Sequence, residues 1–342
     1  MDGNSSWAQF TSWIPLGKRK YQEETTSLPA HSLPDDLDWF NAQSLESYEN
    51  ISSTSATAQV HPHQFTTAMA RLAEEGGVNF ILGSVDAIGY APANDQSSGE
   101  QHAAKETTRS LLELNAPRGK RIQSVSYTGK ATSESRSVPA TVVILAAGPW
   151  TPTLFPAAPI SSLRAHSVTI RPTRPVSAYC LFTHIPIPSE DADNEGLKGQ
   201  HTAAPPGVAK IMSPEIYSRP NNEVYVCGSG DNAVPLPANT DAVEVSRQDC
   251  QNILDAVASI SDELRDGVVI SRRACYLPTV DIGGSGGPMI GETGVPGLLL
   301  AAGHSCWGIH NAPATGKLIS EIVFDGKAIS ADIRGLDPRL VI

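Results

Sequence analysis

The sequence lacks the features that define several classes of protein. No apolar run reaches the length of a membrane span, roughly 20 residues, and the opening MDGNSSWAQF lacks the basic-then-apolar pattern of a signal peptide. Basic residues are few: 25 Lys and Arg stand against 36 Asp and Glu, giving a net charge of −11, and they form no basic stripe. Nucleic acid is therefore disfavoured as a partner, because phosphate binding needs clustered positive charge.

Cysteine is also scarce, and its spacing excludes two kinds of site. The five cysteines are scattered, odd in number and never spaced as C-x-x-C: Cys180, Cys227, Cys250, Cys275 and Cys306. That pattern argues against a disulfide framework and against a cysteine zinc site. We expect a reducing compartment, most simply the cytoplasm.

Histidine offers one further candidate for a metal. His61 and His63 flank Pro62 where a helix is expected to begin. Two imidazoles separated by one residue can bind a metal, but the sequence shows no evident third ligand. Helix capping and packing are the favoured roles, and we predict no metal site.

The sequence does contain enough apolar residues for a substantial core. Its 342 residues are 40% hydrophobic and 18% charged, as in globular proteins. A helix is predicted over 61–77, followed by an apolar strand over 78–90, and another strand over 121–129. Residues 142–147 are apolar without alternation, which predicts a strand buried on both faces.

The middle of the chain has a different character. Residues 160–285 contain several strand-like runs, and two of them meet at Pro220-Asn221-Asn222, which predicts a β-hairpin. A helix is expected near 239–260. We therefore predict an α/β (α+β) fold with three parts. These are an irregular segment over 1–57, a first domain made of 58–150 and 286–342, and a β-rich domain over 151–285.

Residues 297–321, GLLLAAGHSCWGIHNAPATGKLISE, form the most informative segment. The pattern predicts a buried strand, a glycine turn and a closing helix over 313–324. A helix start near 312–315 would expose unpaired N–H groups with a partial positive charge, which favour an anion or an electron-rich ring atom. On the residues alone, glycines that only serve turns explain the segment equally well.

A resemblance favours the ligand-binding interpretation. The segment is similar to the C-terminal flavin-binding signature of the FAD-dependent oxidoreductases related to D-amino-acid oxidase, glycine oxidase and sarcosine oxidase. The matching residues are Gly303, His304, Gly308, Ile309, Pro313, Thr315 and Gly316. The resemblance implies a Rossmann-like FAD-binding fold, with His304 close to the flavin and the helix start facing its electron-rich edge.

Other segments match the same family in order. Residues 60–85 resemble its helix–strand unit, which implies that Val85 meets the adenine end of FAD. VVILAAGPWT resembles the strand and loop that pass the flavin, placing Ala147, Gly148 and Trp150 beside it. The likeness covers roughly residues 58–342 and is greatest to the fungal branch, on PDDLDWF, AQVHPHQFT, CYLPTVD and ADIRGLDPRL. That branch is linked to endosome-to-Golgi retrograde transport, which implies trafficking partners and an endosomal association.

The sequence departs from the family pattern at the dinucleotide fingerprint. No G-x-G-x-x-G turn between a strand and a helix occurs before residue 58, so we expect the Rossmann-like fold to be incomplete at its N-terminus. Because that unit makes the pyrophosphate contacts in the family, tight FAD binding by this chain alone is disfavoured.

A second departure lies in the expected substrate site. Leu277 precedes Pro278, where amino-acid oxidases of the family often carry an arginine that clamps a carboxylate. Arg272 and Arg273 lie nearby, but strand alternation sends them to opposite faces, so at most one reaches a pocket. The resemblance makes the middle sheet the substrate wall, with Tyr217, Arg219 and Arg273 as candidate contacts. On the residues alone, Tyr217 and Arg219 could equally face outward from the hairpin.

Cys275 raises a separate possibility. It matches the cysteine of monomeric sarcosine oxidases that bonds covalently to the flavin. A small buried core cysteine is the favoured alternative.

The resemblance implies oxidation of a C–N bond in a small amine or amino acid, by hydride transfer to FAD. No catalytic side chain is assigned. The alternative is a non-catalytic protein of the same fold that acts in trafficking through protein contacts, or a fragment of a longer chain. The missing fingerprint and Leu277 favour that alternative, whereas the intact glycine turn favours the enzyme.

Overall fold

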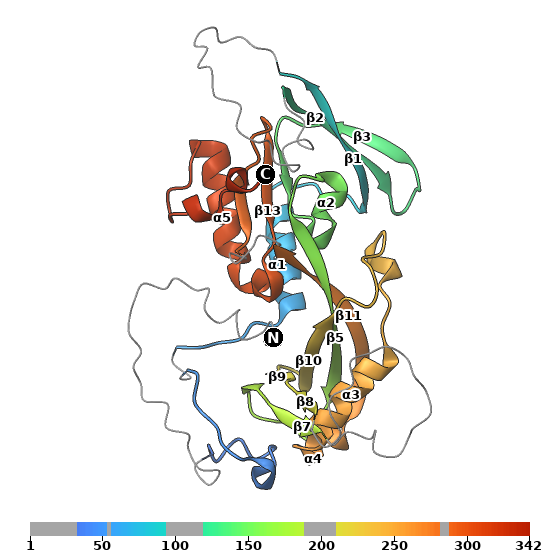
Figure 1. The fold of residues 1–342 in the computed structure, drawn as a ribbon, viewed down its shortest axis with the longest axis vertical. Helices are drawn as coiled ribbons and strands as arrows, with labels where there is room; N and C mark the ends of the chain where they lie inside the picture. The colour runs from blue at the N-terminus through green and yellow to red at the C-terminus, as the bar shows by residue number, and fades with distance from the viewer. Residues whose placement is uncertain (1–32, 53–55, 94–118, 188–209, 281–286) are drawn as a thin grey trace, which may run out of the picture.

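The computed structural model describes residues 33–52, 56–93, 119–187, 210–280 and 287–342. Within them the chain forms four sheets, whose strand orders are β1-β2-β3, β11-β5-β10-β9-β6, β12-β13-β4 and β7-β8. In Figure 1 the five-stranded sheet lies in the lower half of the molecule and the two three-stranded sheets lie in the upper half. The long strands β5 and β11 join the two halves.

The five-stranded sheet is antiparallel throughout. Its strands are β5 (Ile160–Arg171), β6 (Cys180–Phe182), β9 (Glu215–Arg219), β10 (Glu223–Asp231) and β11 (Val268–Val280). Alternation along them sends apolar side chains to one face only. Val168, Ile170 and Ile216 on that face are at most 1% exposed.

Helix α3 (Arg247–Ala258) covers the apolar face of this sheet. Ser246 caps its first turn by accepting from the Asp249 amide, and Ile253 and Val257 pack into the sheet. The short helix α4 (Asp262–Arg265) follows, and β7 (Ile185–Ile187) pairs with β8 (Lys210–Met212) nearby. Trp39, from the expected irregular segment, is 1% exposed in the same core.

The upper half is built around β13. This strand (Leu298–Ala302) pairs in parallel with β4 (Val143–Leu145) and antiparallel with β12 (Met289–Glu292). Helix α5 (Gly308–Asp325) buries Leu318 and Ile319. A separate antiparallel sheet contains β1 (Gly83–Pro92), β2 (Lys120–Gly129) and β3 (Ser135–Pro139). Helices α1 (Pro62–Glu75) and α2 (Thr151–Leu154) complete this half.

Several predictions from the sequence are confirmed. The hairpin joins β9 to β10 through a loop in which Asn221 and Asn222 have φ of 66° and 55°, a backbone region that asparagine tolerates better than most residues. Arg272 and Arg273 lie on opposite faces of β11, opposite Val168 and Ser167 respectively. The predicted helices over 61–77 and near 239–260 both form.

Three expectations were wrong. Helix α5 begins at Gly308, so Ala312–Thr315 lies inside the helix rather than at its start. The strand expected from residue 78 begins at Gly83. Residues 142–147 are not buried on both faces, because β4 is an edge strand among the described residues and Ile144 is 45% exposed.

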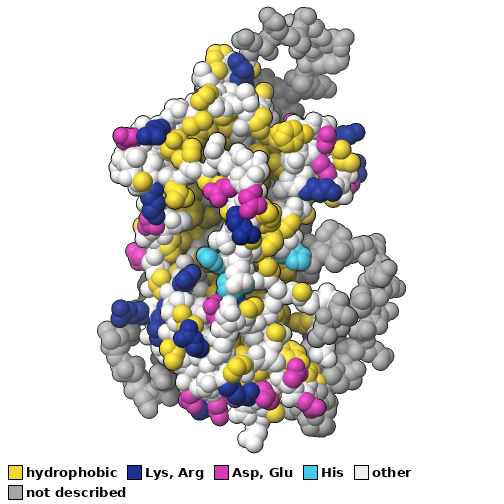
Figure 2. Space-filling model, turned by 180° about the vertical axis from the view of Figure 1, so that it is seen from behind, with side chains coloured by type: hydrophobic (Ala, Val, Ile, Leu, Met, Phe, Trp, Pro, Cys, Tyr) yellow, Lys and Arg dark blue, Asp and Glu magenta, His cyan; other side chains and the backbone are white. Residues whose placement is uncertain are grey.

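Apolar side chains are also exposed on the upper half. Figure 2 shows hydrophobic side chains gathered over it. Those on and after α1 include Met69, Leu72, Val78, Phe80, Ile81 and Leu82, all between 48% and 77% exposed. None of the helices in the described part of the chain is both long and apolar enough to span a bilayer.

Candidate functional site

Two backbone turns meet at one edge of the β12-β13-β4 sheet. Strands β4 and β13 run in parallel, with Leu145 opposite Leu300, so their carboxyl ends lie side by side. Ala147 and a 3-10 turn over Gly148–Trp150 follow β4, and the Gly303-His304 turn follows β13. In open α/β sheets, ligands bind beyond the carboxyl ends of neighbouring parallel strands.

The turn after β13 requires glycine. Gly303 has φ of +85°, which L side chains rarely adopt. A Cβ there would also lie 2.4 Å from Cγ2 of Val280, the last residue of β11. The turn after β4 has a similar requirement, since Gly148 has φ of +54°. Both glycines are therefore needed for the backbone conformation of these turns.

Because α5 begins at Gly308, the backbone amides that lack a helical partner lie earlier in the chain than the sequence predicted. Trp307 is the N-cap, so the amides of α5 without a helical partner are those of Gly308–His310. Pro313 lies within the helix and has no N–H, which leaves the Ile309 carbonyl without its usual helical donor. Donors to an electron-rich group would therefore come from the first turn of α5, immediately after the glycine turn, and not from residues 313–316.

His304 is held by the same helix. Its Nε2 lies 3.0 Å from the Thr315 hydroxyl oxygen, and Thr315 is 7% exposed. Burial lowers the pKa of His304, which favours the neutral ring at neutral pH. The pair fixes the imidazole against α5 and fastens the helix to the glycine turn.

Space beside the backbone is open at several glycines of the signature. A Cβ built on Gly148 or Gly316 would meet no atom within 4 Å, and one on Gly308 would meet only the His304 Cβ, at 3.8 Å. Gly316 is exposed on α5. A flat group could therefore approach the backbone closely at these positions, as the resemblance to flavoproteins requires.

The other face of the five-stranded sheet is polar. Arg273, Ser167, Cys227 and Glu215 are successive partners across β11, β5, β10 and β9, so they share this face. Thr169, Tyr225, Tyr217 and Cys180 form the next row. We call these eight residues the polar face. β11, at one edge of this sheet, contacts both turns described above, over 148–150 and 305–307.

The structure brings the predicted substrate contacts to this region. Tyr217 and Arg273 belong to the polar face, and Arg219 lies two residues beyond Tyr217 on β9, on the same side. The Arg219 guanidinium stacks 4.1 Å from the centre of the Tyr225 ring and contacts Glu223 at 3.3 Å. The Tyr217 hydroxyl donates to Glu215 at 2.5 Å. These roles in substrate binding stay predictions.

Cys275 also lies on this side of β11, two residues beyond Arg273. It is exposed, so the expected small buried core cysteine was wrong for this position. Cys250, on the buried face of α3, fits that description at 0% exposed. Val85 is 45% exposed on β1, which belongs to a different sheet from the glycine turn. Its role at the adenine end of FAD stays a prediction.

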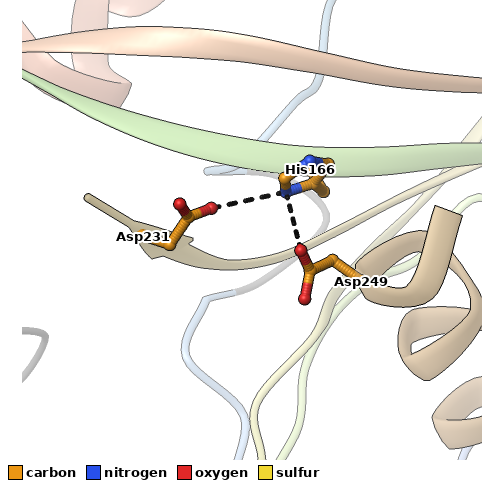
Figure 3. A group of neighbouring side chains, drawn as sticks. All are labelled: His166, Asp231 and Asp249. Atoms are coloured by element: carbon orange, nitrogen blue, oxygen red, sulfur yellow. Dashed lines mark ion pairs between the residues drawn. The ribbon is translucent and has the colours of Figure 1, made fainter. Parts of the chain in front are cut away.

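A second cluster, drawn in Figure 3, was not predicted from the sequence. The buried His166 Nδ1 lies 3.7 Å from an Asp231 oxygen and 3.8 Å from an Asp249 oxygen, and Arg164 contacts Asp231 at 3.0 Å. Strand β5 supplies Arg164 and His166, β10 supplies Asp231, and α3 supplies Asp249. The cluster therefore joins three segments that are separate in the sequence.

The three side chains have a spacing that could hold a metal ion, but the hydrogen bonding opposes it. The Ser246 amide donates to His166 Nε2 at 3.0 Å. A neutral ring carries one hydrogen, which must then lie on Nδ1, and a protonated nitrogen cannot bind a metal. The cluster therefore fastens α3 to the sheet through hydrogen bonds and charge.

The comparison with protein families agrees with the geometry at the sheet edge. A model described as FAD dependent oxidoreductase, DAO, matches residues 16–322. The chain belongs to the DAO family of FAD-dependent oxidoreductases. Its FAD-binding Rossmann-like α/β fold follows from that membership, and FAD is the cofactor of the family.

Two fungal proteins are similar to this chain in sequence. TDA3 of Saccharomyces cerevisiae, provisionally named an oxidoreductase, is 35% identical over 315 residues, which cover 90% of this chain and 55% of TDA3. A second provisional oxidoreductase, from Schizosaccharomyces pombe, is 31% identical over 90% of this chain and 70% of its own length. The chain therefore spans little more than half of the first relative.

Solved structures show the same fold. L-proline dehydrogenase from P. horikoshii superposes with a TM-score of 0.55 at 15% identity, covering 94% of this chain and 69% of the enzyme. Iminodiacetate oxidase from Chelativorans gives 0.50 at 16% identity, with 81% and 58% covered. An association of this DAO-family chain with endosomes or trafficking proteins stays a prediction.

Proposed function

We propose that this chain carries the ring-facing and substrate-facing parts of an FAD-dependent oxidoreductase that oxidises a C–N bond of a small amine or amino-acid-like molecule. One observation supports this most: the two turns that require glycine, after β4 and β13, lie side by side at the sheet edge. β11 contacts both turns and also contributes to the polar face.

The chain's own residues suit a flavin ring. Open space beside Gly148, Gly308 and Gly316 admits a flat group. The free amides at the start of α5 suit an electron-rich edge, and the helix dipole adds to their effect. Neutral His304, fixed by Thr315, offers a polar ring nitrogen without adding a positive charge.

When bound, FAD supplies the acceptor for a hydride taken from the carbon beside the substrate nitrogen. The protein's part is to orient that carbon and to exclude water. Tyr217, Arg219 and Arg273 would contact the substrate, and Leu277 offers no charge to a substrate carboxylate.

The visible absorption spectrum of the purified protein tests this proposal. Flavin absorption bands are expected, and they should weaken in Thr315→Val, which removes the partner of His304 without changing the size of the side chain much. A neutral hydrogen bond contributes about 1 kcal/mol, so flavin affinity should fall about fivefold. A featureless spectrum from the unaltered protein, after incubation with FAD, would favour the non-catalytic alternative.

Covalent attachment through Cys275 has its own readout. Its exposed thiol on β11, which contacts the turn over 305–307, supports the proposal. A band that keeps flavin fluorescence after denaturing electrophoresis, and loses it in Cys275→Ser, would support a covalent bond. A band without fluorescence would show that any flavin is held by non-covalent contacts.

A further inference from the structure

Glu215 is a half-buried carboxylate on the polar face, and it contacts two neutral donors. The Tyr217 hydroxyl donates to Oε2 at 2.5 Å and the Cys227 thiol contacts the same oxygen at 3.7 Å. Among the described residues, no Lys, Arg or His forms an ion pair with Glu215. A half-buried carboxylate held only by neutral donors can still meet an incoming cation.

The two side chains that contact Glu215, Tyr217 and Cys227, stay uncharged near neutral pH. Burial first, and then the hydrogen bond and charge of Glu215, raise the pKa of Tyr217 well above its ordinary value. Burial and then the charge of Glu215 likewise raise the pKa of Cys227. Both groups therefore act as donors that hold the carboxylate in place, and neither adds a positive charge.

The guanidinium of Arg219, on the same strand as Glu215, contacts other side chains. Arg219 contacts Glu223 at 3.3 Å and stacks on the Tyr225 ring at 4.1 Å. Arg171, two residues beyond Thr169 on β5, also lies on this side, and so does Arg273, which is three strands from Glu215 across the sheet. At about 4.8 Å between neighbouring strands, its backbone is about 14 Å from that of Glu215.

Glu215 lies in the same cross-strand row as Arg273, and β11, which carries Arg273, contacts the turn over 305–307. The proposed function places the substrate beside this face. The electrostatics agree with this position: burial first, and then the charge of Glu215, raise the pKa of Cys306, which lies three residues after Gly303.

The chemistry decides which nitrogen can meet this charge. Oxidation breaks the C–H bond with its electron pair leaving as hydride to FAD, while the nitrogen lone pair forms the C=N bond of an iminium product. The reacting nitrogen must therefore be unprotonated, yet a carboxylate stabilises the protonated form of an amine beside it. A cation bound at Glu215 has to be a different nitrogen.

We propose that Glu215 anchors a second, protonated nitrogen of the substrate, so that the substrates are diamines or polyamines. This inference rests on the proposed function for the identity of the reacting end. The anchor itself depends only on the described contacts of Glu215. A monoamine would place its single nitrogen at Glu215 and so bind without being oxidised.

Calorimetric titration of the full chain tests the anchor without any flavin signal. The probes are putrescine, n-butylamine and the uncharged 1,4-butanediol, and the variants are Glu215→Gln and the control Glu134→Gln. Glu134 is exposed and paired with Arg136 on the β2–β3 hairpin, far from the polar face in sequence and sheet. Equal thermal stability of both variants and the unaltered protein establishes folding.

Both amines should bind the unaltered protein and Glu134→Gln, and the diol should not. Loss of a charge-assisted hydrogen bond should weaken both amines about tenfold or more in Glu215→Gln. Equal amine binding in Glu215→Gln and the unaltered protein would overturn the proposal, as would diol binding comparable to that of putrescine, or no binding of either amine.

Anaerobic mixing of the FAD-loaded protein with each amine separates this inference from the proposed function. Putrescine should bleach the flavin absorption and n-butylamine should not. Bleaching by n-butylamine would overturn the two-nitrogen requirement while leaving the oxidoreductase role intact. Glu215-dependent amine binding in a protein that takes up no FAD would support the anchor and overturn the redox role.

Discussion

Helices α1 and α3 carry similar sequence patterns but differ in burial. Both place apolar residues at helical spacing, which predicts one buried face. In α3, Ile253 and Val257 are 2% and 1% exposed against the five-stranded sheet. In α1 no residue is buried, and Met69 and Leu72 are 48% and 54% exposed. A pattern therefore identifies the face that favours burial, but not whether a partner layer covers it.

Strands β10 and β4 also differ in how far their apolar side chains are buried. Val224 and Val226 of β10 are 0% exposed, because β5 and β9 flank the strand and α3 covers it. Ile144 of β4 is 45% exposed at the edge of its sheet. The lower half thus has a closed core, whereas the upper half presents apolar surface among the described residues. The chain also covers only 55% of its Saccharomyces cerevisiae relative.

The largest expected effect comes from a matched pair of core substitutions. Ile253→Ala should lower the free energy of unfolding by about 2–5 kcal/mol, because it leaves a cavity in a closed core. Leu72→Ala in α1 should change it by less than about 1 kcal/mol, since much of that side chain is already in water. Urea unfolding followed by tryptophan fluorescence measures both. Similar losses would show that α1 is as tightly packed as α3.

A buried and an exposed ion pair should also differ in what they contribute to the free energy of unfolding. Asp231→Ala removes the partner of Arg164, whose side chain is 5% exposed, and should cost about 2–3 kcal/mol because a buried guanidinium loses its counter-charge. Asp241→Ala removes the exposed pair with Lys130 and should cost no more than about 0.5 kcal/mol. The same unfolding measurement applies, and a reversed order would contradict the packing described.

Acidification should weaken the lower half through His166. Burial lowers the pKa of this imidazole, although Asp249 and Asp231 oppose the shift. The unfolded chain therefore binds a proton more readily below about pH 6.5, and the stabilising contribution, present above that pH, is lost as pH falls towards the folded-state pKa. One proton corresponds to a slope of at most about 1.4 kcal/mol per pH unit.

The variant His166→Gln isolates this effect. Its amide oxygen can still accept from the Ser246 amide, but the side chain does not titrate. Unfolding free energies measured from pH 7.5 to 5.5 should fall less steeply in the variant than in the unaltered protein. His304 also has a lowered pKa and titrates in both proteins, so the difference between the two slopes belongs to His166. Identical slopes would refute the assignment.

Local patterns in the sequence predicted much of the fold. Alternation identified the β9–β10 hairpin and the opposite directions of Arg272 and Arg273, because period-two patterning reflects a sheet with one buried face. The signature residues after β13 were identified by resemblance, and their glycines do meet a backbone requirement at Gly303. The family itself was predicted correctly in this way.

Long-range features were missed for physical reasons. Pro313 indicated a helix start because proline favours the first turn, yet α5 begins five residues earlier and tolerates the missing hydrogen bond. The His166–Asp231–Asp249 cluster joins two strands and a helix, and no local pattern encodes such a meeting. Glu215 could have been found, since it alternates with Tyr217 on β9, but its lack of a cationic partner is a tertiary property.

The smallest expected change in stability comes from an exposed aromatic residue in the upper half. Phe80→Ser replaces an aromatic ring that is 53% exposed in the segment between α1 and β1. Because the ring is largely hydrated in the folded chain, the free energy of unfolding should change by no more than about 0.5 kcal/mol. Self-association measured by light scattering should decrease, since exposed apolar patches promote it. A large loss of stability would instead show that another part of the chain packs on Phe80.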